Sequence, residues 1–469
     1  MINYFNFKKF GDEYLLTNDT GRYAFVSEDT LKALIENKNI SEDIYNKLKD
    51  NFFVYDEHNG VFVERIKHHI RDNKSYLFSS TALHIFVLTN ICNMSCVYCQ
   101  AKDDTKIVHH KMTKEIAEKS VDIALSSPSR FLTFEFQGGE PLANFEVLKH
   151  IVEYTEERKR GKNISYSIVT NLSLLTDEIL DFLIKYNINI STSLDGDEEL
   201  HNFNRRFQNG GDTFTTVRNK IEYIQEKGYS VGAIQTTTRN SFDKVKEIID
   251  TYVSCKQTSI FIRPLTRLGT AERVWNTIGY TVDEFLKFYE DCLRYIIKLN
   301  KEGVDICERH AVIFLRKILQ GYAENYMELR SPCGATVGQI AYFYDGNIFT
   351  CDEGRMLYEM GNDAFKLGNV FENTFDDLVQ SSTCKAVCIA SLLESQLNCC
   401  DCVYQPYCGT CPVINLAQEK DIFFKNIESF RCRVYGGMLD ILFNILKANN
   451  PDEIKVLKKW IGGSCYEEK

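Results

Sequence analysis

The chain has 469 residues, and its 44% hydrophobic and 26% charged content is typical of an ordinary globular protein. The net charge of −10 argues against a nucleic-acid surface, and apolar runs such as 82–89 are far below the ~20 residues that span a bilayer. The N-terminus lacks the apolar segment of an export signal, so we expect a cytoplasmic protein without a nucleic-acid or membrane partner. The length suggests about three domains at ~150 residues each.

Seventeen cysteines are the unusual feature of the composition. Because the cytoplasm is reducing, clustered cysteines there bind metal or take part in chemistry more often than they form disulfides. Three cysteines fall within 92–99 and eleven lie beyond residue 330. The scattered Cys255, Cys292 and Cys307 are expected to be packing residues.

Residues 1–80 are predicted to form a small opening unit. Two short strands flank an Asn-Asp-Thr-Gly turn at 18–21, and Ser27 is placed to cap the amphipathic helix that follows. A second helix of the same kind is predicted at 41–51, and the sequence FFVYD at 52–56 predicts a further strand.

Residues 81–305 alternate between apolar strands and amphipathic helices, which predicts a parallel sheet covered on both faces. The strands are expected at 83–90, 131–139, 164–171, 188–196, 231–238 and 259–265. The helices between them are expected at 114–127, 145–159, 176–186, 215–228 and 242–253, and a longer helix at 282–303 follows the last strand. This pattern indicates an α/β fold of the barrel or doubly wound type.

Residues that can bind a metal or a ligand follow the ends of the first three strands. Cys92, Cys96 and Cys99 come just after the first, Gly-Gly-Glu-Pro at 138–141 closes the second, and Thr-Asn at 170–171 ends the third. Active sites of parallel barrels collect at the carboxyl ends of the strands. The sequence therefore predicts one site at this rim.

Three thiolates can hold three irons of a 4Fe–4S cluster and leave the fourth iron open to another ligand. The cysteine spacing, Tyr98 before the last cysteine, and the Gly-Gly-Glu-Pro at 138–141 resemble the radical S-adenosylmethionine enzymes. The resemblance implies a partial (β/α)6 barrel with S-adenosylmethionine on the open iron. It also implies reductive cleavage of that cofactor to a 5′-deoxyadenosyl radical, which abstracts hydrogen from unactivated carbon.

The same resemblance assigns further residues to S-adenosylmethionine. Gly138, Gly139 and Glu140 are expected at its amino group, because glycines let the backbone approach closely and a carboxylate accepts from an ammonium. The other residues expected at the cofactor are Tyr98, Thr170, Asn171, Ser193 and Arg205. Thr170 and Ser193 could instead cap nearby helices, and Tyr98 could instead be a packing residue.

Residues 306–469 contain an irregular cysteine-rich segment and end in helical sequence at 436–462. The run at 399–411 resembles the SPASM extension of peptide-modifying radical enzymes, which houses two auxiliary 4Fe–4S clusters. The resemblance implies one cluster on Cys399, Cys402, Cys408 and Cys432, and another on Cys333, Cys351 and Cys411. The fourth ligand of the latter stays open between Cys384, Cys388 and an iron left free, because Gln339 stands where some relatives have cysteine.

The opening unit resembles the PqqD-like elements that hold the leader of a ribosomally made peptide, by adding it as a strand to a sheet edge. A structural plug or a dimer contact is the alternative role of this unit. The stretches 16–27, 81–101, 134–142 and 407–413 together further resemble the radical maturases of His-Xaa-Ser peptide systems.

These patterns together predict a radical maturase of a precursor peptide that carries three 4Fe–4S clusters. Abstraction of a side-chain hydrogen is expected to lead to a crosslink or a related modification, with a low-potential donor such as ferredoxin or flavodoxin as the reductant. One alternative is an anaerobic sulfatase maturase that forms formylglycine. The other is a zinc-stabilised binding protein without catalysis, since cysteine spacing alone does not separate zinc from iron–sulfur ligation.

Overall fold

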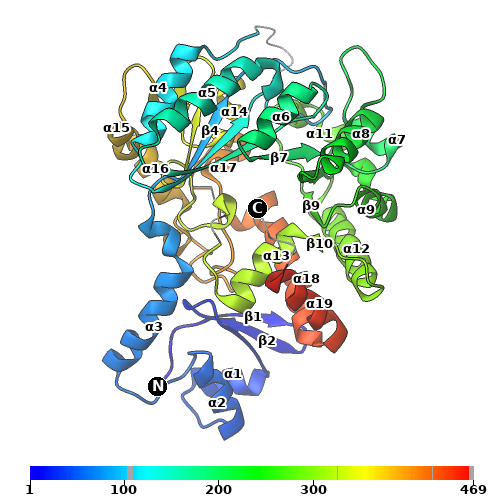
Figure 1. Ribbon diagram of the computed structural model, residues 1–469. Helices are drawn as coiled ribbons and strands as arrows, with labels where there is room; N and C mark the ends of the chain where they lie inside the picture. Colours follow the sequence, from blue (N-terminus) through cyan, green and yellow to red (C-terminus); the bar gives the residue numbers. More distant parts are fainter. Residues whose placement is uncertain (103–108, 325, 425, 464–469) are drawn as a thin grey trace.

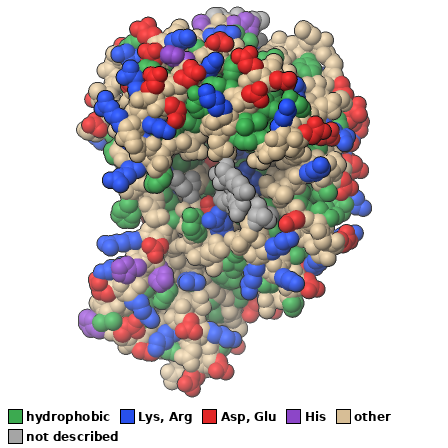
Figure 2. Space-filling model, in the orientation of Figure 1, with side chains coloured by type: hydrophobic (Ala, Val, Ile, Leu, Met, Phe, Trp, Pro, Cys, Tyr) green, Lys and Arg blue, Asp and Glu red, His purple; other side chains and the backbone are tan. Residues whose placement is uncertain are grey.

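The computed structural model describes residues 1–102, 109–324, 326–424 and 426–463. Over these ranges the strands form a three-stranded antiparallel sheet near the N-terminus and a ten-stranded sheet in the main body (Figure 1). None of the helices in the described ranges combines the length and the apolar character needed to cross a bilayer. On the face shown in Figure 2, acidic and basic side chains are interspersed without a continuous basic stripe.

The N-terminal sheet has the order β1-β2-β3, and it is followed by two short helices. The bounds are β1 Asn6–Phe10, β2 Glu13–Thr17, β3 Tyr23–Val26, α1 Glu28–Ile35 and α2 Glu42–Asp50. Ser27 caps α1 as predicted, accepting a hydrogen bond from Thr30 N at 3.2 Å. The strand predicted at 52–56 is wrong: Phe52 has a φ of +62°, which breaks an extended run, and only Val54 bridges to Ile2.

Helix α3 (Asn59–Asn73) connects this unit to the main body, yet the sheet itself packs on the C-terminal part of the chain (Figure 1). The rings of Tyr23 and Phe25 lie 5.3 and 6.3 Å from that of Phe443, in edge-on contacts. Such aromatic pairs contribute beyond their buried area. Residues distant in sequence are therefore joined at this interface.

All six strands predicted for the main body are present, and each pairs in parallel with the next one along the chain. They are β4 Leu83–Val87, β5 Phe131–Gln137, β6 Asn163–Val169, β7 Ile188–Ser193, β8 Val231–Thr236 and β9 Ser259–Arg263. The helices are α4 Lys114–Leu125, α5 Phe145–Arg158, α6 Asp177–Lys185, α7 Glu198–Asn204, α8 Thr213–Glu226, α9 Val245–Ser254, α10 Thr270–Arg273, α11 Trp275–Ile278 and α12 Val282–Lys301.

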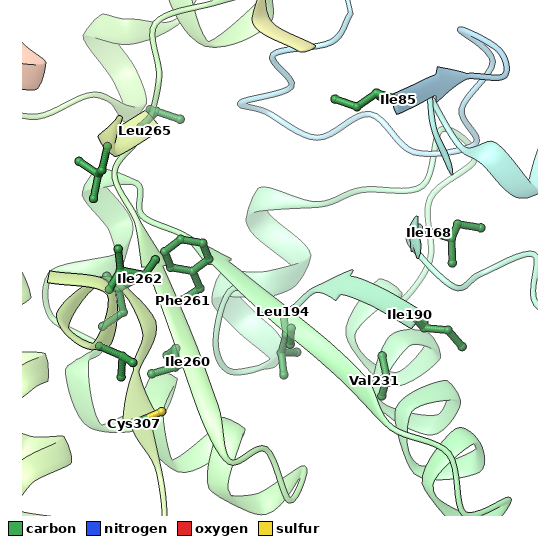
Figure 3. Close-up of a cluster of buried hydrophobic side chains, with 14 of the residues drawn as sticks. Ile85, Ile168, Ile190, Leu194, Val231, Ile260, Phe261, Ile262, Leu265 and Cys307 are labelled. Atoms are coloured by element: carbon green, nitrogen blue, oxygen red, sulfur yellow. The ribbon is translucent and has the colours of Figure 1, made fainter. Parts of the chain in front are cut away.

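The strands hold together because their apolar side chains meet the apolar stripes of these helices. Figure 3 shows part of this core, with Ile85 from β4, Ile168 from β6, Ile190 from β7 and Val231 from β8. The core also contains three cysteines predicted to be packing residues, Cys255, Cys292 and Cys307, all essentially inaccessible to solvent.

The sheet continues beyond the six parallel strands at both ends, in the order β10-β9-β8-β7-β6-β5-β4-β11-β12-β13. The added strands are β10 Cys307–Glu308, β11 Gln339–Tyr342, β12 Asn347–Phe349 and β13 Lys366–Asn369. β11 pairs in parallel with β4, and the two strands after it are antiparallel. The sheet is thus open and mostly parallel, as expected for a partial barrel, and the cysteine-rich segment extends it at the first strand.

The remaining helices surround the cysteine-rich segment and close the chain. They are α13 Arg309–Leu315, α14 Asp352–Glu359, α15 Phe375–Gln380, α16 Ser382–Ser391, α17 Pro412–Glu419, α18 Phe430–Ala448 and α19 Pro451–Gly462. The last two contain the helical sequence predicted at 436–462.

Candidate functional site

Cys92, Cys96 and Cys99, here called the first thiol set, lie on the loop that leaves the carboxyl end of β4. Burial, with a smaller contribution from neighbouring thiolates, raises the pKa of the Cys92 thiol to about 11 and that of Cys96 to about 12. The three thiols are therefore shielded from solvent and lie within electrostatic range of one another. Such thiols lose their protons when a metal binds.

The Gly-Gly pair after β5 holds this loop in place. Gly139 N donates to Thr89 O and Glu140 N donates to Ile91 O, both at 2.8 Å. A Cβ at Gly138 would lie 2.4 Å from the Thr89 carbonyl oxygen, and Gly138 has a φ of +154°. The sequence predicted that the glycines let the backbone approach a ligand. In the structure, their missing side chains allow the loop after β4 to pack closely against the end of β5.

A second segment, residues 204–208, supports the other side of the loop. Ser95 N donates to Arg206 O at 2.7 Å and Val97 N donates to Asn204 O at 2.9 Å. Gln208 reaches the Cys92 carbonyl through its side chain, at 2.9 Å. Sequence reasoning missed this support, because backbone pairing leaves no residue signature.

Glu140 is 1% exposed and organises the end of β6. Its carboxylate accepts hydrogen bonds from Thr170 Oγ1 at 2.6 Å, Asn171 N at 2.8 Å and Leu142 N at 3.0 Å. Burial raises the pKa of Glu140 to about 7, while these donors act in the opposite direction. The structure thus brings three of the predicted cofactor residues into one hydrogen-bonded group.

Tyr98 and Arg205 meet at a buried carboxylate that sequence reasoning did not select, Asp195. Tyr98 Oη donates to Asp195 Oδ2 at 2.5 Å, and Arg205 Nε donates to the same oxygen at 3.3 Å. The guanidinium lies 5.3 Å from the centre of the Tyr98 ring and 3.9 Å from Cys96 Sγ. Asp195 stands in the Ser-Leu-Asp-Gly stretch from which only Ser193, at the end of β7, had been chosen.

These residues fit an iron–sulfur cluster by the chemistry of their donors. N–H groups point at the thiol sulfurs: Met94 N lies 3.4 Å and Asn171 Nδ2 3.9 Å from Cys92 Sγ. Hydrogen bonds to the sulfurs are one of the means by which a protein tunes such a cluster. The buried carboxylate of Glu140 can accept hydrogen bonds from the ammonium group of an amino acid, and the guanidinium of Arg205 can donate to its carboxylate.

The second thiol set, Cys333, Cys351 and Cys411, packs in one apolar cluster with Leu268 and Ala101. Cys351 and Cys411 are the residues preceding helices α14 and α17, and Cys351 Sγ accepts from Gly354 N at 3.3 Å. Burial raises the pKa of all three thiols. Ala101 follows the first thiol set in the chain, so the two sets are neighbours.

Both cysteine candidates for a fourth ligand of this set lie on the same helix. Helix α16 carries Cys384 and Cys388, and it contacts Cys333, whose backbone N donates to Ser391 Oγ at 3.0 Å. Gln339 lies in β11 and pairs with β4. The geometry brings α16 to the second thiol set without selecting one of its cysteines.

The third thiol set consists of Cys399, Cys402, Cys408 and Cys432. Burial, together with the charges of the other three thiols, raises the pKa of Cys432 to about 12. Residues of the N-terminal sheet cover this set: Asn6 Nδ2 donates to Cys402 O at 3.1 Å. Within the described ranges, no three His, Cys, Asp or Glu side chains lie close enough to bind a single metal ion.

A small pocket opens between the carboxyl end of β9 and helices α17 and α18. Beyond it, Thr270 N donates to Cys99 O at 2.8 Å, and Gly269 is tightly packed against that carbonyl. On α18, Cys432 of the third thiol set follows Arg431, which lines the pocket. The pocket is therefore flanked by the first and third thiol sets.

Comparison with known proteins identifies the domain that carries this site. Residues 86–252 match the model of the Radical SAM superfamily, so this stretch is a radical SAM domain. The radical SAM cyclopropyl synthase TigE of Paramaledivibacter caminithermalis is 23% identical over 347 residues, 68% of this chain and 67% of that protein. A cysteine-type anaerobic sulfatase-maturating enzyme of Clostridium perfringens is 24% identical over 303 residues, 62% of this chain and 78% of that enzyme.

Two solved structures share the fold. Native anSMEcpe with bound AdoMet superposes with a TM-score of 0.67 at 20% identity, and covers 81% of this chain and 99% of its own. Streptococcus suis SuiB bound to its precursor peptide SuiA superposes with a TM-score of 0.55 at 18% identity, over 92% of this chain and 99% of its own. Residues 1–80 are 17% of the chain, so the match to SuiB includes part of the N-terminal unit.

Proposed function

We propose that this chain is a radical S-adenosylmethionine enzyme of the SPASM type that modifies a ribosomally made precursor peptide. The observation that carries the proposal is the gathering of three thiols, a buried carboxylate and a guanidinium at the carboxyl ends of β4 to β7 of a radical SAM domain. The modification is a crosslink or a related change that begins with removal of a side-chain hydrogen.

In this proposal the first thiol set holds a 4Fe–4S cluster. Glu140, with Gly138 and Gly139, faces the amino group of S-adenosylmethionine, and Arg205 faces its carboxylate. When bound, the cluster and S-adenosylmethionine supply a hydrogen-abstracting radical. Asp195 and Tyr98 fix the guanidinium beside Cys96, and Thr170 and Asn171 fix the carboxylate of Glu140, so the chain holds both charged groups without needing the cofactor to order them.

Two auxiliary 4Fe–4S clusters belong to the same proposal. The second thiol set holds one of them and the third thiol set holds the other, so the enzyme has three clusters. Support comes from the packing of the second thiol set in one apolar cluster and from the mutual electrostatic effects among the thiols of the third set. The auxiliary clusters accept the electron left after hydrogen removal or bind the substrate, and a ferredoxin- or flavodoxin-like protein is the proposed external donor.

The N-terminal unit is proposed to bind the peptide. Of the sixteen exposed large apolar side chains in the described residues, eight lie in this unit. They are Met1, Tyr4, Phe7, Ile35, Val61, Val63, Leu77 and Phe78. The β3 strand pairs with β2 on one side only, which leaves an edge for an added strand. The fold match to SuiB supports this role, and the narrower resemblance to His-Xaa-Ser maturases stays a prediction.

A second candidate function is the formation of formylglycine on a sulfatase. It is favoured by the likeness to cysteine-type sulfatase-maturating enzymes, one of which is 27% identical over 305 residues. A short sulfatase-loop peptide separates the two: its oxidation to an aldehyde selects the sulfatase function, and its inertness selects the precursor peptide. A non-catalytic zinc protein is the third possibility, and iron and sulfide analysis tests it.

The first experiment is anaerobic reconstitution followed by addition of S-adenosylmethionine and dithionite. The parent protein is expected to contain about twelve iron atoms, four per cluster, and to form 5′-deoxyadenosine. A Cys92→Ala, Cys96→Ala, Cys99→Ala variant is expected to lose about four iron atoms and all deoxyadenosine formation. A Cys400→Ala variant is the control. Iron loading without deoxyadenosine in the parent, even with peptide present, would overturn the proposal.

A further inference from the structure

The pocket beyond β9 is lined by two arginines and one carboxylate. Arg263 is the last residue of β9, Arg431 lies in the first turn of α18, and Glu328 lies on the segment between them. Leu265 and Phe430 form the apolar part of the wall. A charged group and an apolar wall side by side are typical of sites that orient a ligand.

Glu328 uses both of its oxygens to hold the arginines. Oε1 accepts from Arg263 at 2.5 Å and from Tyr326 at 3.3 Å. Oε2 accepts from Arg431 at 3.0 Å and from Tyr435 at 2.8 Å. Burial alone would raise the pKa of Glu328, but the two guanidiniums hold it below its usual range. This carboxylate is therefore ionised and fully occupied.

The two guanidiniums, in contrast, keep unused donors. Nε of Arg431 is buried and has no hydrogen-bond partner among the described residues. The hydrogen bond of Arg263 runs through one terminal nitrogen, and 35% of its side chain is exposed. A buried donor without a partner costs free energy, so a ligand that accepts from it is favoured.

The charges of the lining residues do not balance either. Two guanidiniums share one carboxylate, which leaves one positive charge in the pocket wall. A further carboxylate that acts on Arg263, Glu353 on α14, does not line the pocket.

We propose that this pocket binds a carboxylate of the peptide substrate, through Arg263 and Arg431, and thereby sets which residue is presented for modification. The inference rests on the proposed peptide-modifying function. The carboxylate belongs either to an aspartate or glutamate side chain or to the C-terminus of the peptide. A guanidinium is suited to either, because it pairs with carboxylates through two parallel hydrogen bonds.

The test uses the reconstituted holoenzyme with S-adenosylmethionine and four small probes, with binding followed by NMR line broadening. N-acetyl-aspartate amide and N-acetyl-asparagine amide compare a side-chain carboxylate with its amide. N-acetyl-alanine and N-acetyl-alanine amide do the same for a C-terminal carboxylate. One acid is expected to bind at least about tenfold more tightly than its amide, as for loss of a charge-assisted hydrogen bond. The pair that shows the difference identifies the source of the carboxylate.

Substitutions then connect the preference to the pocket. Arg431→Gln and Arg263→Gln are each expected to abolish it, and Arg263→Lys to retain part of it. Because Arg263 is partly exposed, its variants keep the test valid if Arg431→Gln fails to fold. Arg218→Gln, on the surface of α8, is the control and keeps the full preference.

Equal binding of acid and amide, absence of saturable binding by both acids, or a preference that survives both glutamine substitutions would overturn the inference. Deoxyadenosine formation is measured on the same preparations. Its absence from the parent protein would count against the proposed function, whereas the acid-to-amide ratio reports on the pocket alone. The two failures are thus distinguishable.

Discussion

Cys92, Cys96 and Cys99 come from one loop of eight residues, whereas Cys333, Cys351 and Cys411 come from separate elements spread over 79 residues. Bringing distant residues together costs more chain entropy than closing a short loop. The first thiol set is held by backbone hydrogen bonds to the ends of neighbouring strands. The second thiol set has mostly apolar packing around it, so a metal cluster there would be expected to stabilise the fold itself.

The largest expected effect follows from that difference. Replacing Cys351 and Cys411 together by alanine should lower the free energy of unfolding of the reconstituted protein by roughly 3 kcal/mol or more, because loss of a metal site is among the strongest destabilising changes. Alanine at all three positions of the first thiol set should lower the free energy of unfolding by less, because backbone hydrogen bonds to neighbouring segments hold that loop. Anaerobic thermal unfolding measures both. Similar losses in the two variants would contradict the contrast between the two sets.

Deoxyadenosine formation should rank the same two variants in the opposite order: the variant that loses more stability should keep more of this activity. The Cys351→Ala, Cys411→Ala protein keeps it where the fold survives, since the first thiol set is intact. Peptide product is lost in both variants. Retention of product without the second thiol set would show that this set is structural only.

The next effect concerns the backbone that holds the first thiol set. A Cβ at Gly139 would lie 2.4 Å from the Ile91 carbonyl oxygen, so Gly139→Ala must displace the cysteine loop. We expect a loss of about 1–3 kcal/mol in stability, as for overpacking elsewhere, together with incomplete iron loading. Gly232→Ala in β8 is the matched control, because its Cβ would lie 3.9 Å from the nearest atom. Normal iron loading in Gly139→Ala would refute the role given to this glycine.

The contrast between local and assembled sites also explains what the sequence could predict. The six parallel strands, and the residues at their ends, follow from alternation and spacing that any short window contains. The three strands β11 to β13 were missed because they are short and depend on tertiary pairing: β11 pairs with β4, more than 250 residues earlier, and β12 and β13 add to its edge. Tertiary pairing of this kind leaves no periodicity in the segment itself.

Asp195 was missed for a related reason. A single aspartate in a loop is ordinary, and only the fold shows that it lies buried between Tyr98 and Arg205. The pocket at Arg263 and Arg431 is likewise assembled from residues 168 positions apart. The first thiol set, in contrast, lies within eight successive positions of the sequence, and so its cysteines could be named as ligand candidates in advance.

Asp195 provides the next smaller effect. Asp195→Asn keeps the shape of the side chain but removes the charge that holds Arg205, so the KM for S-adenosylmethionine should rise about tenfold, as for loss of one charged hydrogen bond. The maximal rate of deoxyadenosine formation should change much less. Asp197→Asn, at the start of α7, is the control, since Asp197 pairs with Lys244 instead. An unchanged KM in Asp195→Asn would remove Arg205 from the cofactor site.

The smallest expected effect compares two buried glutamates. Burial raises the pKa of both Glu140 and Glu308 to about 7. A carboxyl whose pKa is higher in the folded than in the unfolded state stabilises the fold at low pH, and this contribution is lost as the pH rises through the folded value. The metal-free protein should therefore lose about 1 kcal/mol per glutamate between about pH 6.5 and about pH 8.

Cofactor binding should separate the two glutamates. In the proposed site an ammonium group lies beside Glu140 and favours its ionised form, so the part of the pH dependence due to Glu140 disappears in the loaded enzyme. Glu308 accepts from Tyr289 Oη at 2.6 Å and from Ala311 N at 2.7 Å, and it keeps its contribution. Unfolding of the loaded and metal-free forms of Glu140→Gln and Glu308→Gln, at both pH values, measures this. A pH dependence of Glu140 that survives loading would place the ammonium elsewhere.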